Sequence, residues 1–142
     1  MRSPAKPEAA IEVVAGGLFD SQGRVLIAQR PAGKPLAGRW EFPGGKLDAG
    51  EDPYTGLVRE LREELGVVVR SAERLLRYGY RYPDRTVRLD MWLVTDWSGE
   101  LEPHDGQALA WVEPSRLGEH DLLEADWPIV EALQALPPRA RQ

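Results

Sequence analysis

Residues 52–66 carry the strongest local signal in the sequence, a helix whose beginning, buried face and end are all specified. Asp52 is a favourable N-cap, Pro53 suits the first helical position, and Gly66 suits the position directly after a helix. Between them, apolar side chains recur at helical spacing and form one face: Tyr54, Leu57, Val58, Leu61 and Leu65. The segment therefore predicts a helix over residues 53–65 with one buried face.

Strand-like segments lie on both sides of this helix in the sequence, as apolar and β-branched runs. In order, the predicted strands begin at Ile11, cover residues 24–30 and 40–42, begin again at Val67, and cover residues 75–82, 86–95 and 108–112. Turns at residues 20–23 and 83–85 predict hairpins. A single helical turn is expected at 114–117, and a second helix from Pro128 to a stop at Pro137. This alternation predicts an α/β fold with a mixed β-sheet and helices on both faces.

The length of 142 residues fits one domain. Residues 1–8 contain two prolines and no periodic apolar pattern, so they are predicted to be a flexible N-terminal tail. Residues 9–138 form the single predicted domain, and residues 139–142 a C-terminal tail. The chain has no cysteine, which excludes a disulfide scaffold, a thiolate metal site and a cysteine nucleophile.

Charge and hydropathy restrict the partners. The net charge is −5, with 18 Lys and Arg against 23 Asp and Glu, which argues against stable binding to nucleic acid or to an anionic membrane. No apolar run is long enough to span a bilayer, and the first residues lack the apolar stretch of a signal peptide. We therefore expect a cytoplasmic protein, either a monomer or a homodimer.

Three glutamates on the predicted helix indicate a chemical role. Glu60, Glu63 and Glu64 are i, i+3 and i+4 neighbours that share one sector of the helix, where like charges repel. Glu64 also lies at the border of the apolar stripe, where an ionised carboxylate needs compensation. A divalent cation such as Mg²⁺ or Mn²⁺ supplies it through hard oxygen ligands. The alternative is a solvated acidic helix face with arginines nearby.

The loop before the helix favours the metal interpretation. Phe42-Pro43-Gly44-Gly45 places glycines where the backbone can turn sharply and expose a carbonyl, which is a plausible further metal ligand. An ordinary Pro-Gly turn is the alternative for this segment taken alone.

The spacing of these residues resembles the Nudix box at every defined position. The pattern is Gly45, five residues, Glu51, seven residues, Arg59-Glu60-Leu61, one residue, Glu63-Glu64, one residue, and Gly66-Val67. The resemblance implies the Nudix fold, an α/β/α sandwich with a mixed β-sheet. It also implies hydrolysis of a nucleoside diphosphate linked to another group, with a divalent metal as cofactor: Mg²⁺, or Mn²⁺ as an alternative.

Further segments resemble the MutT-like branch of that family. They are residues 28–30, 38–46, 82–85, 105–107 and 125–128. The branch hydrolyses oxidised purine nucleoside triphosphates such as 8-oxo-dGTP to the monophosphate and pyrophosphate. The resemblance therefore implies a nucleotide substrate and a role in cleansing the nucleotide pool, in support of DNA repair.

The resemblance also implies roles for individual residues at the metal site. Glu60, Glu63 and Glu64 are the expected catalytic metal ligands, with Glu60 as the candidate general base. The Gly44 carbonyl and the Asp105 carboxylate are expected to complete the metal site. Three residues are expected to support the site, Gly45, Glu51 and Arg59, and the last two are the pair expected to fix the loop against the helix.

Four residues match substrate-binding positions of the branch: Arg30, Phe42, Arg85 and Asp126. The two arginines are expected to contact phosphate or base, with solvated strand-end arginines as the alternative. Phe42 is expected to pack on the base, with core packing as the alternative. Asp126 stands where relatives often carry Asn. An ionised carboxylate accepts from the two adjacent donors of a guanine-type edge, whereas a protonated Asp would suit other bases. Its alternative role is the N-cap of the helix that begins at Pro128.

Other functions remain open at this point. A diphosphatase for CTP or modified dCTP, or a nucleoside-diphosphate-sugar hydrolase, would share the same box. A non-catalytic nucleotide sensor on the same scaffold is the alternative from another class. Such sensors usually lose metal-binding carboxylates, whereas Glu60, Glu63 and Glu64 are all present.

Overall fold

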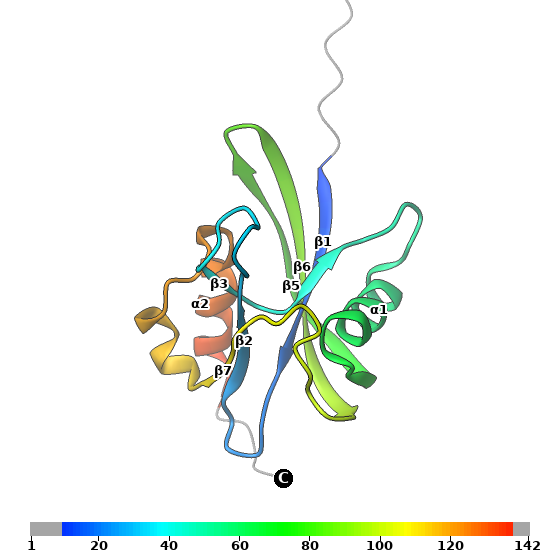
Figure 1. Ribbon diagram of the computed structural model, residues 1–142, viewed down its shortest axis with the longest axis vertical. Coiled ribbons are helices and arrows are strands. Elements are labelled where there is room, and N and C mark those ends of the chain that lie inside the picture. The colour runs from blue at the N-terminus through cyan, green and yellow to red at the C-terminus, as the bar shows by residue number, and fades with distance from the viewer. Residues whose placement is uncertain (1–9, 138–142) are drawn as a thin grey trace, which may run out of the picture.

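The computed structural model describes residues 10–137, so both predicted tails, residues 1–8 and 139–142, lie outside the described residues. Two sheets lie between two helices (Figure 1). The first sheet has the strand order β4-β1-β6-β5, with bounds Gly44–Lys46, Ile11–Leu18, Arg85–Ser98 and Val68–Tyr82. The second has the order β3-β2-β7, with bounds Trp40–Glu41, Val25–Gln29 and Leu109–Val112. Strands β1 and β6 run parallel and the other pairs antiparallel, which confirms the mixed α/β architecture.

Helix α1 (Pro53–Leu65) has the predicted caps. The Asp52 side chain accepts a hydrogen bond from the Thr55 N–H, and Gly66 takes a left-handed conformation with φ of 70°. The apolar stripe packs on the first sheet, where Leu57 and Leu61 are fully buried. Gly16 on β1 lets the helix approach, because a Cβ there would lie 3.0 Å from Leu61 Cδ1. The helix is therefore held firmly against β1, which pairs along one edge with β4, the strand that contains Gly44.

Helix α2 (Trp127–Ala135) and two short 3₁₀ helices, Pro114–Glu119 and Glu124–Asp126, lie on the opposite side of the sheets (Figure 1). Their apolar residues share a core with the inner strands, including fully buried Ile27, Met91 and Ile129. The predicted C-terminal helix and the predicted turn at 114–117 are thus confirmed. Among the described residues, neither helix has the length and hydropathy needed to cross a bilayer.

The predicted hairpin between the first two strands is wrong. Its turn does form, since the Asp20 carboxylate accepts from the backbone N–H groups of Gln22 and Arg24. However, β1 is paired with β4 on one edge and β6 on the other, so no edge remains for β2. A single bridge between Phe19 and Val25 joins the two segments, and β2 continues in the second sheet.

Two further strands differ from the sequence analysis. Strand β5 runs without a break from Val68 to Tyr82, whereas we predicted separate strands from Val67 and over 75–82. Register shifts around Ser71 and Leu76 disturb the alternation of side chains, which hides the continuity from a pattern of period two. Strand β4 was not predicted, because its glycines have low strand propensity and form a strand only by pairing with β1.

Candidate active site

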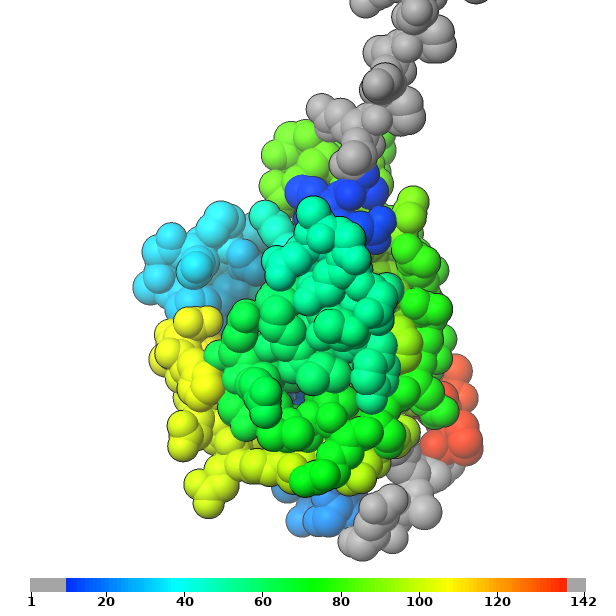
Figure 2. Space-filling model, turned by 90° about the vertical axis from the view of Figure 1, so that its right-hand side faces the viewer, coloured from blue at the N-terminus to red at the C-terminus, as the bar shows by residue number. Residues whose placement is uncertain are grey.

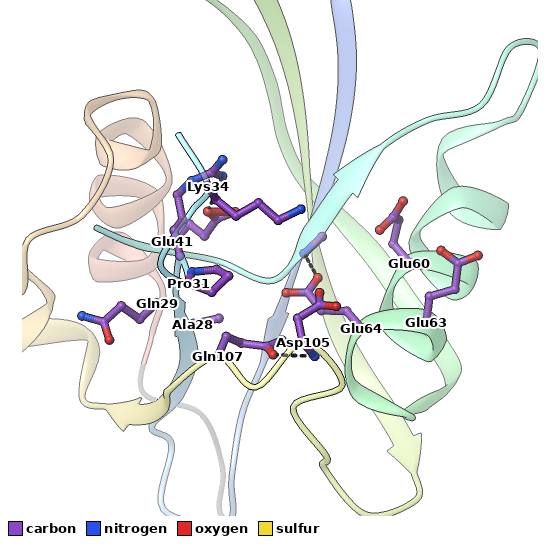
Figure 3. Close-up of a pocket in the computed structure, with 12 residues that line it drawn as sticks. Ala28, Gln29, Pro31, Lys34, Glu41, Glu60, Glu63, Glu64, Asp105 and Gln107 are labelled. Carbon is purple, nitrogen blue, oxygen red and sulfur yellow. Dashed lines mark hydrogen bonds and ion pairs between the residues drawn. The ribbon is translucent and has the colours of Figure 1, made fainter. Parts of the chain in front are cut away.

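An acidic cavity of about 360 Å³ opens between α1 and the second sheet (Figure 3). Its walls come from α1, from the loop after β2, and from the segment before β7, which lie next to one another in Figure 2. Five carboxylates line the cavity, those of Glu41, Glu60, Glu63, Glu64 and Asp105. Only two cationic side chains, Arg30 and Lys34, are among its lining residues, so the cavity carries an excess of negative charge.

Glu64 is a half-buried carboxylate in the wall of this cavity. It accepts a hydrogen bond of 3.1 Å from the Gly44 N–H, which links α1 to β4. Burial, together with the charges of Glu41, Glu60 and Asp105, raises the pKa of Glu64 to about 7 against the lowering effect of that hydrogen bond. A cation placed among these carboxylates would relieve both the burial cost and the repulsion.

Glu60 and Glu63 contact Arg59 in this structure. The Arg59 guanidinium lies 2.9 Å from the Glu60 carboxylate and 3.1 Å from that of Glu63. Burial raises the pKa of Glu60, opposed by the hydrogen bond from Arg59. Gly45 faces the Glu60 carboxylate so closely that a Cβ at position 45 would lie 2.6 Å from Glu60 Cδ. A side chain at position 45 would therefore force the Glu60 carboxylate to shift.

The oxygen ligands of this cavity suit a hard cation, although the carboxylates are not arranged around a single point. Within residues 10–137, no three His, Cys, Asp or Glu side chains form a ready cluster for one ion. Carboxylates and backbone carbonyls are the ligands that Mg²⁺ and Mn²⁺ prefer. Coordination by Glu60 or Glu63 together with Glu64 requires the first two to turn away from Arg59.

Arg59 and Glu51 fasten the loop after β4 to α1. Two hydrogen bonds of 2.8 Å join the guanidinium to both Glu51 oxygens, and Arg59 also donates to the Lys46 carbonyl. Glu51 accepts from the Asp48 N–H within the same loop. These bonds, chiefly that from Arg59, lower the pKa of Glu51 to about 2. The geometry is the one that a supporting role for this pair requires.

We expect Glu51→Gln to lower the melting temperature at pH 7 and to lose that effect in acid. A carboxyl whose folded pKa is depressed stabilises the fold above its unfolded pKa of 4.5, and this stabilisation is lost as pH falls toward 2. Thermal unfolding of both proteins between pH 7 and pH 2 measures the difference. A gap in melting temperature that is constant over this range would contradict the charge-based role of Glu51.

A second cavity of about 250 Å³ adjoins the first, and the two share Arg30, Glu41 and Gly44. Its lining includes all four predicted substrate-binding residues: Arg30, Phe42, Arg85 and Asp126. Arg30 is paired with Glu41 at 2.7 Å, and the Arg85 guanidinium lies 5.1 Å above the Tyr82 ring. The cavity thus combines aromatic, cationic and carboxylate groups, which are the elements of a polar pocket for a flat ligand.

Asp126 lines this second cavity and is 5% exposed. Its alternative role as a helix N-cap is wrong, because its side chain makes no capping bond to α2. Instead, one carboxylate oxygen accepts from the Phe42 N–H at 3.3 Å. Burial, together with the nearby charge of Glu41, raises the pKa of Asp126 to about 7. Both protonation states of Asp126 are therefore accessible near neutral pH.

Phe42 belongs to the hydrophobic core and is only 2% exposed, as its core-packing alternative required. It also lines the second cavity, so a base-packing role would use the small part of the ring that faces the cavity.

Asp105 lies on an exposed loop at the mouth of the first cavity, beside Glu64 (Figure 3).

Three residues of this region were missed by the sequence analysis. Glu41 lines both cavities, and Gln107 is buried in the wall of the first. His104 contacts the Glu63 carbonyl. The sequence carried a signal for Glu41 and Gln107, which lie in segments 38–46 and 105–107 that resemble the MutT-like branch, and none for His104.

Comparison with known proteins places this architecture in a family. A family model of the NUDIX domain matches residues 10–133. CTP pyrophosphohydrolase from Escherichia coli (strain K12) is 42% identical over 126 residues, covering 89% of this chain and 93% of that protein. An 8-oxo-dGTP diphosphatase from Haemophilus influenzae is 41% identical over 107 residues, covering 75% and 79%.

Comparison of the fold with solved structures supports the same family assignment. The solution structure of the E. coli ORF135 protein superposes with a TM-score of 0.82 at 40% identity, covering 94% of this chain and 95% of that one. The predicted Nudix fold and the resemblance to the Nudix box are thereby confirmed. The chain belongs to the Nudix hydrolase family.

Proposed function

We propose that this chain is a metal-dependent nucleoside triphosphate pyrophosphohydrolase that acts on oxidised purine nucleotides of the 8-oxo-dGTP type. The observation that carries the proposal is the pair of adjoining cavities that share Arg30, Glu41 and Gly44. The acidic cavity suits a polyphosphate with its cations, and the second suits a base. The products are the nucleoside monophosphate and pyrophosphate.

Glu60, Glu63, Glu64, Asp105 and the Gly44 carbonyl would hold Mg²⁺, or Mn²⁺ in its place. When bound, the metal neutralises phosphate charge and makes a water more acidic. A polyphosphate would be repelled by five carboxylates alone, so the excess negative charge of the cavity itself favours a bound cation.

The chain's own residues supply positioning and proton transfer. Glu60 is the proposed base that takes a proton from the attacking water, and burial, which raises its pKa, makes it a better proton acceptor. That water attacks the β-phosphorus, and the bond to the oxygen that bridges the α- and β-phosphates breaks. Arg30 and Lys34, which also line this cavity, would bind phosphate oxygens.

Asp126 is the proposed reader of the base edge. When ionised, its free oxygen accepts from the N–H donors of a guanine-type base. Protonated Asp126 offers a donor instead, which suits the acceptor edge of cytosine. Hydrolysis of CTP or a modified dCTP is therefore the second candidate function, supported by the raised pKa of Asp126 and by the similarity to a CTP pyrophosphohydrolase.

We expect the preference for 8-oxo-dGTP over CTP to rise about tenfold or more between pH 6 and pH 8. The pKa of Asp126 is about 7, so the accepting carboxylate becomes the main form across this range. The ratio of kcat/KM for the two nucleotides measures the effect. In Asp126→Asn, which does not titrate, the ratio should stay flat, and an equal pH dependence in both proteins would exclude Asp126 from base recognition.

A panel of nucleotides tests the proposed function as a whole. Each nucleotide is incubated with Mg²⁺, and pyrophosphate and orthophosphate are measured separately. Release of pyrophosphate from 8-oxo-dGTP ahead of dGTP and CTP is the expected result. Orthophosphate release, or faster cleavage of a nucleoside-diphosphate sugar, would contradict the proposal.

We further propose the cellular setting that this activity requires. Residues 9–138 act as one domain on a small-molecule nucleotide, without stable binding to nucleic acid or membrane. The protein works in the cytoplasm, as a monomer or a homodimer, where it cleanses the nucleotide pool.

A further inference from the structure

The segment before β7 is fastened to the C-terminal end of α1. The last carbonyls of a helix have no partner within it. Here the Glu64 carbonyl accepts from the backbone N–H of His104 at 3.1 Å, and the Leu65 carbonyl accepts from that of Glu102 at 3.0 Å. The His104 ring adds a third bond, since its Nδ1 lies 2.6 Å from the Glu63 carbonyl oxygen. This atom must carry the proton, because a carbonyl only accepts.

Gln107 holds the other end of the same segment. Its side chain is 5% exposed in the wall of the acidic cavity, and its Oε1 accepts from the Asp105 N–H at 3.0 Å. The Nε2 group is buried with no hydrogen-bond partner among the described residues. Burying an unpaired donor is unfavourable, so packing alone does not explain why this amide is buried here.

Asp105 lies between these two attachments. Among residues 10–137, its carboxylate takes part in no hydrogen bond or ion pair, although its backbone is held on both sides. The loop is therefore fixed, while the side chain beside Glu64 remains available to a ligand (Figure 3). A carboxylate on an unfastened exposed loop would lose conformational freedom whenever it bound a cation.

We infer that His104 and Gln107 are positioning residues that present the Asp105 carboxylate to a divalent cation in the acidic cavity. The inference rests on the proposed function, because it requires that cavity to bind metal. His104 acts through its bond to the Glu63 carbonyl on the helix that supplies the other carboxylates. Gln107 acts through its bond to the backbone of Asp105 itself. Partners that orient metal ligands commonly govern affinity in this way.

Binding of Mn²⁺ alone to the full chain, measured by the loss of the free-ion electron paramagnetic resonance signal, tests this role without turnover. We expect His104→Leu and Gln107→Met each to weaken Mn²⁺ binding about tenfold. His104→Asn should bind as the parent does, because Asn Nδ2 occupies the position of the donating Nδ1. Glu131→Gln is the control, since Glu131 is an exposed residue of α2 and contacts neither attachment. Melting temperatures without metal confirm that each variant is folded.

Combination with Asp105→Asn separates positioning from general loosening of the structure. If His104 acts through Asp105, His104→Leu should not weaken Mn²⁺ binding further in the Asp105→Asn background. Equal weakening in both backgrounds, or parent-like binding by both His104→Leu and Gln107→Met, would overturn the inference. Glu64→Gln distinguishes this failure from failure of the metal site, because only the latter would leave Mn²⁺ binding unchanged in Glu64→Gln.

Discussion

Glu64→Gln should reduce metal-dependent hydrolysis about a thousandfold, because removing one charged ligand costs several kcal/mol of transition-state stabilisation. The fold should survive, since the amide oxygen of the new side chain can still accept from the Gly44 N–H. At pH 8 the melting temperature should rise. Glu64, with a pKa of about 7, is ionised there at the cost of its burial, and glutamine removes that cost. Initial rates of pyrophosphate release and thermal unfolding measure the two effects.

The matched control is Glu131→Gln, which makes the same chemical change at an exposed position of α2, away from both cavities. This variant should hydrolyse at the parent rate. Parent-like turnover by Glu64→Gln would remove Glu64 from the reaction, whatever its effect on stability.

Gly44→Ala should lower the free energy of unfolding by about 3 kcal/mol, because a methyl group here overpacks a rigid backbone contact. The added Cβ would clash with the Val14 carbonyl oxygen and lie 2.7 Å from the Ala15 Cα. Neither atom can move without breaking the pairing of β1 with β4. Activity should fall as well, since the Gly44 N–H that binds Glu64 would be displaced. Urea unfolding gives the stability change.

Gly118→Ala is the control for this substitution, because a Cβ at position 118 meets no atom within 4 Å and its backbone is not left-handed. Its unfolding free energy should remain close to that of the parent. A similar value for Gly44→Ala would show that β4 does not pack against β1 as described.

The helix that carries the glutamates could be predicted because its signals are local. Asp52 caps its start through a bond to Thr55, Pro53 suits its first turn, and Gly66 ends it through bonds to residues no more than five positions away. Its apolar stripe specifies which face packs on the sheet. The relative placement of Glu60, Glu63 and Glu64 follows from this helix alone.

Strand pairing could not be predicted in the same way, because it depends on residues far apart in the sequence. The turn at Asp20 looks like a hairpin turn, yet β1 pairs with β6, more than sixty residues further along the chain. The sequence near residue 20 does not indicate that β1 pairs with other strands along both of its edges. Gly44–Lys46 likewise becomes a strand only because β1 lies beside it.

The same difference between local signals and long-range contacts applies to the residues of the two cavities. Regular spacing on one helix pointed to the carboxylates, and the resemblance pointed to Asp105 and Asp126. Sequence reasoning assigned nothing to His104, whose contact with Glu63 spans 41 positions, and missed the burial of Gln107. It also left open the role of Asp126, whose bond to the Phe42 N–H spans 84 positions.

Diffraction from crystals soaked with Mn²⁺ and a non-hydrolysable nucleoside triphosphate tests the central claim most directly. We predict anomalous scattering peaks among the carboxylates of Glu60, Glu64 and Asp105, in contact with the phosphates, and the base in the cavity closed by Asp126. Carboxylates that remain bound to Arg59 or turn to solvent, with no peak among them, would contradict the account.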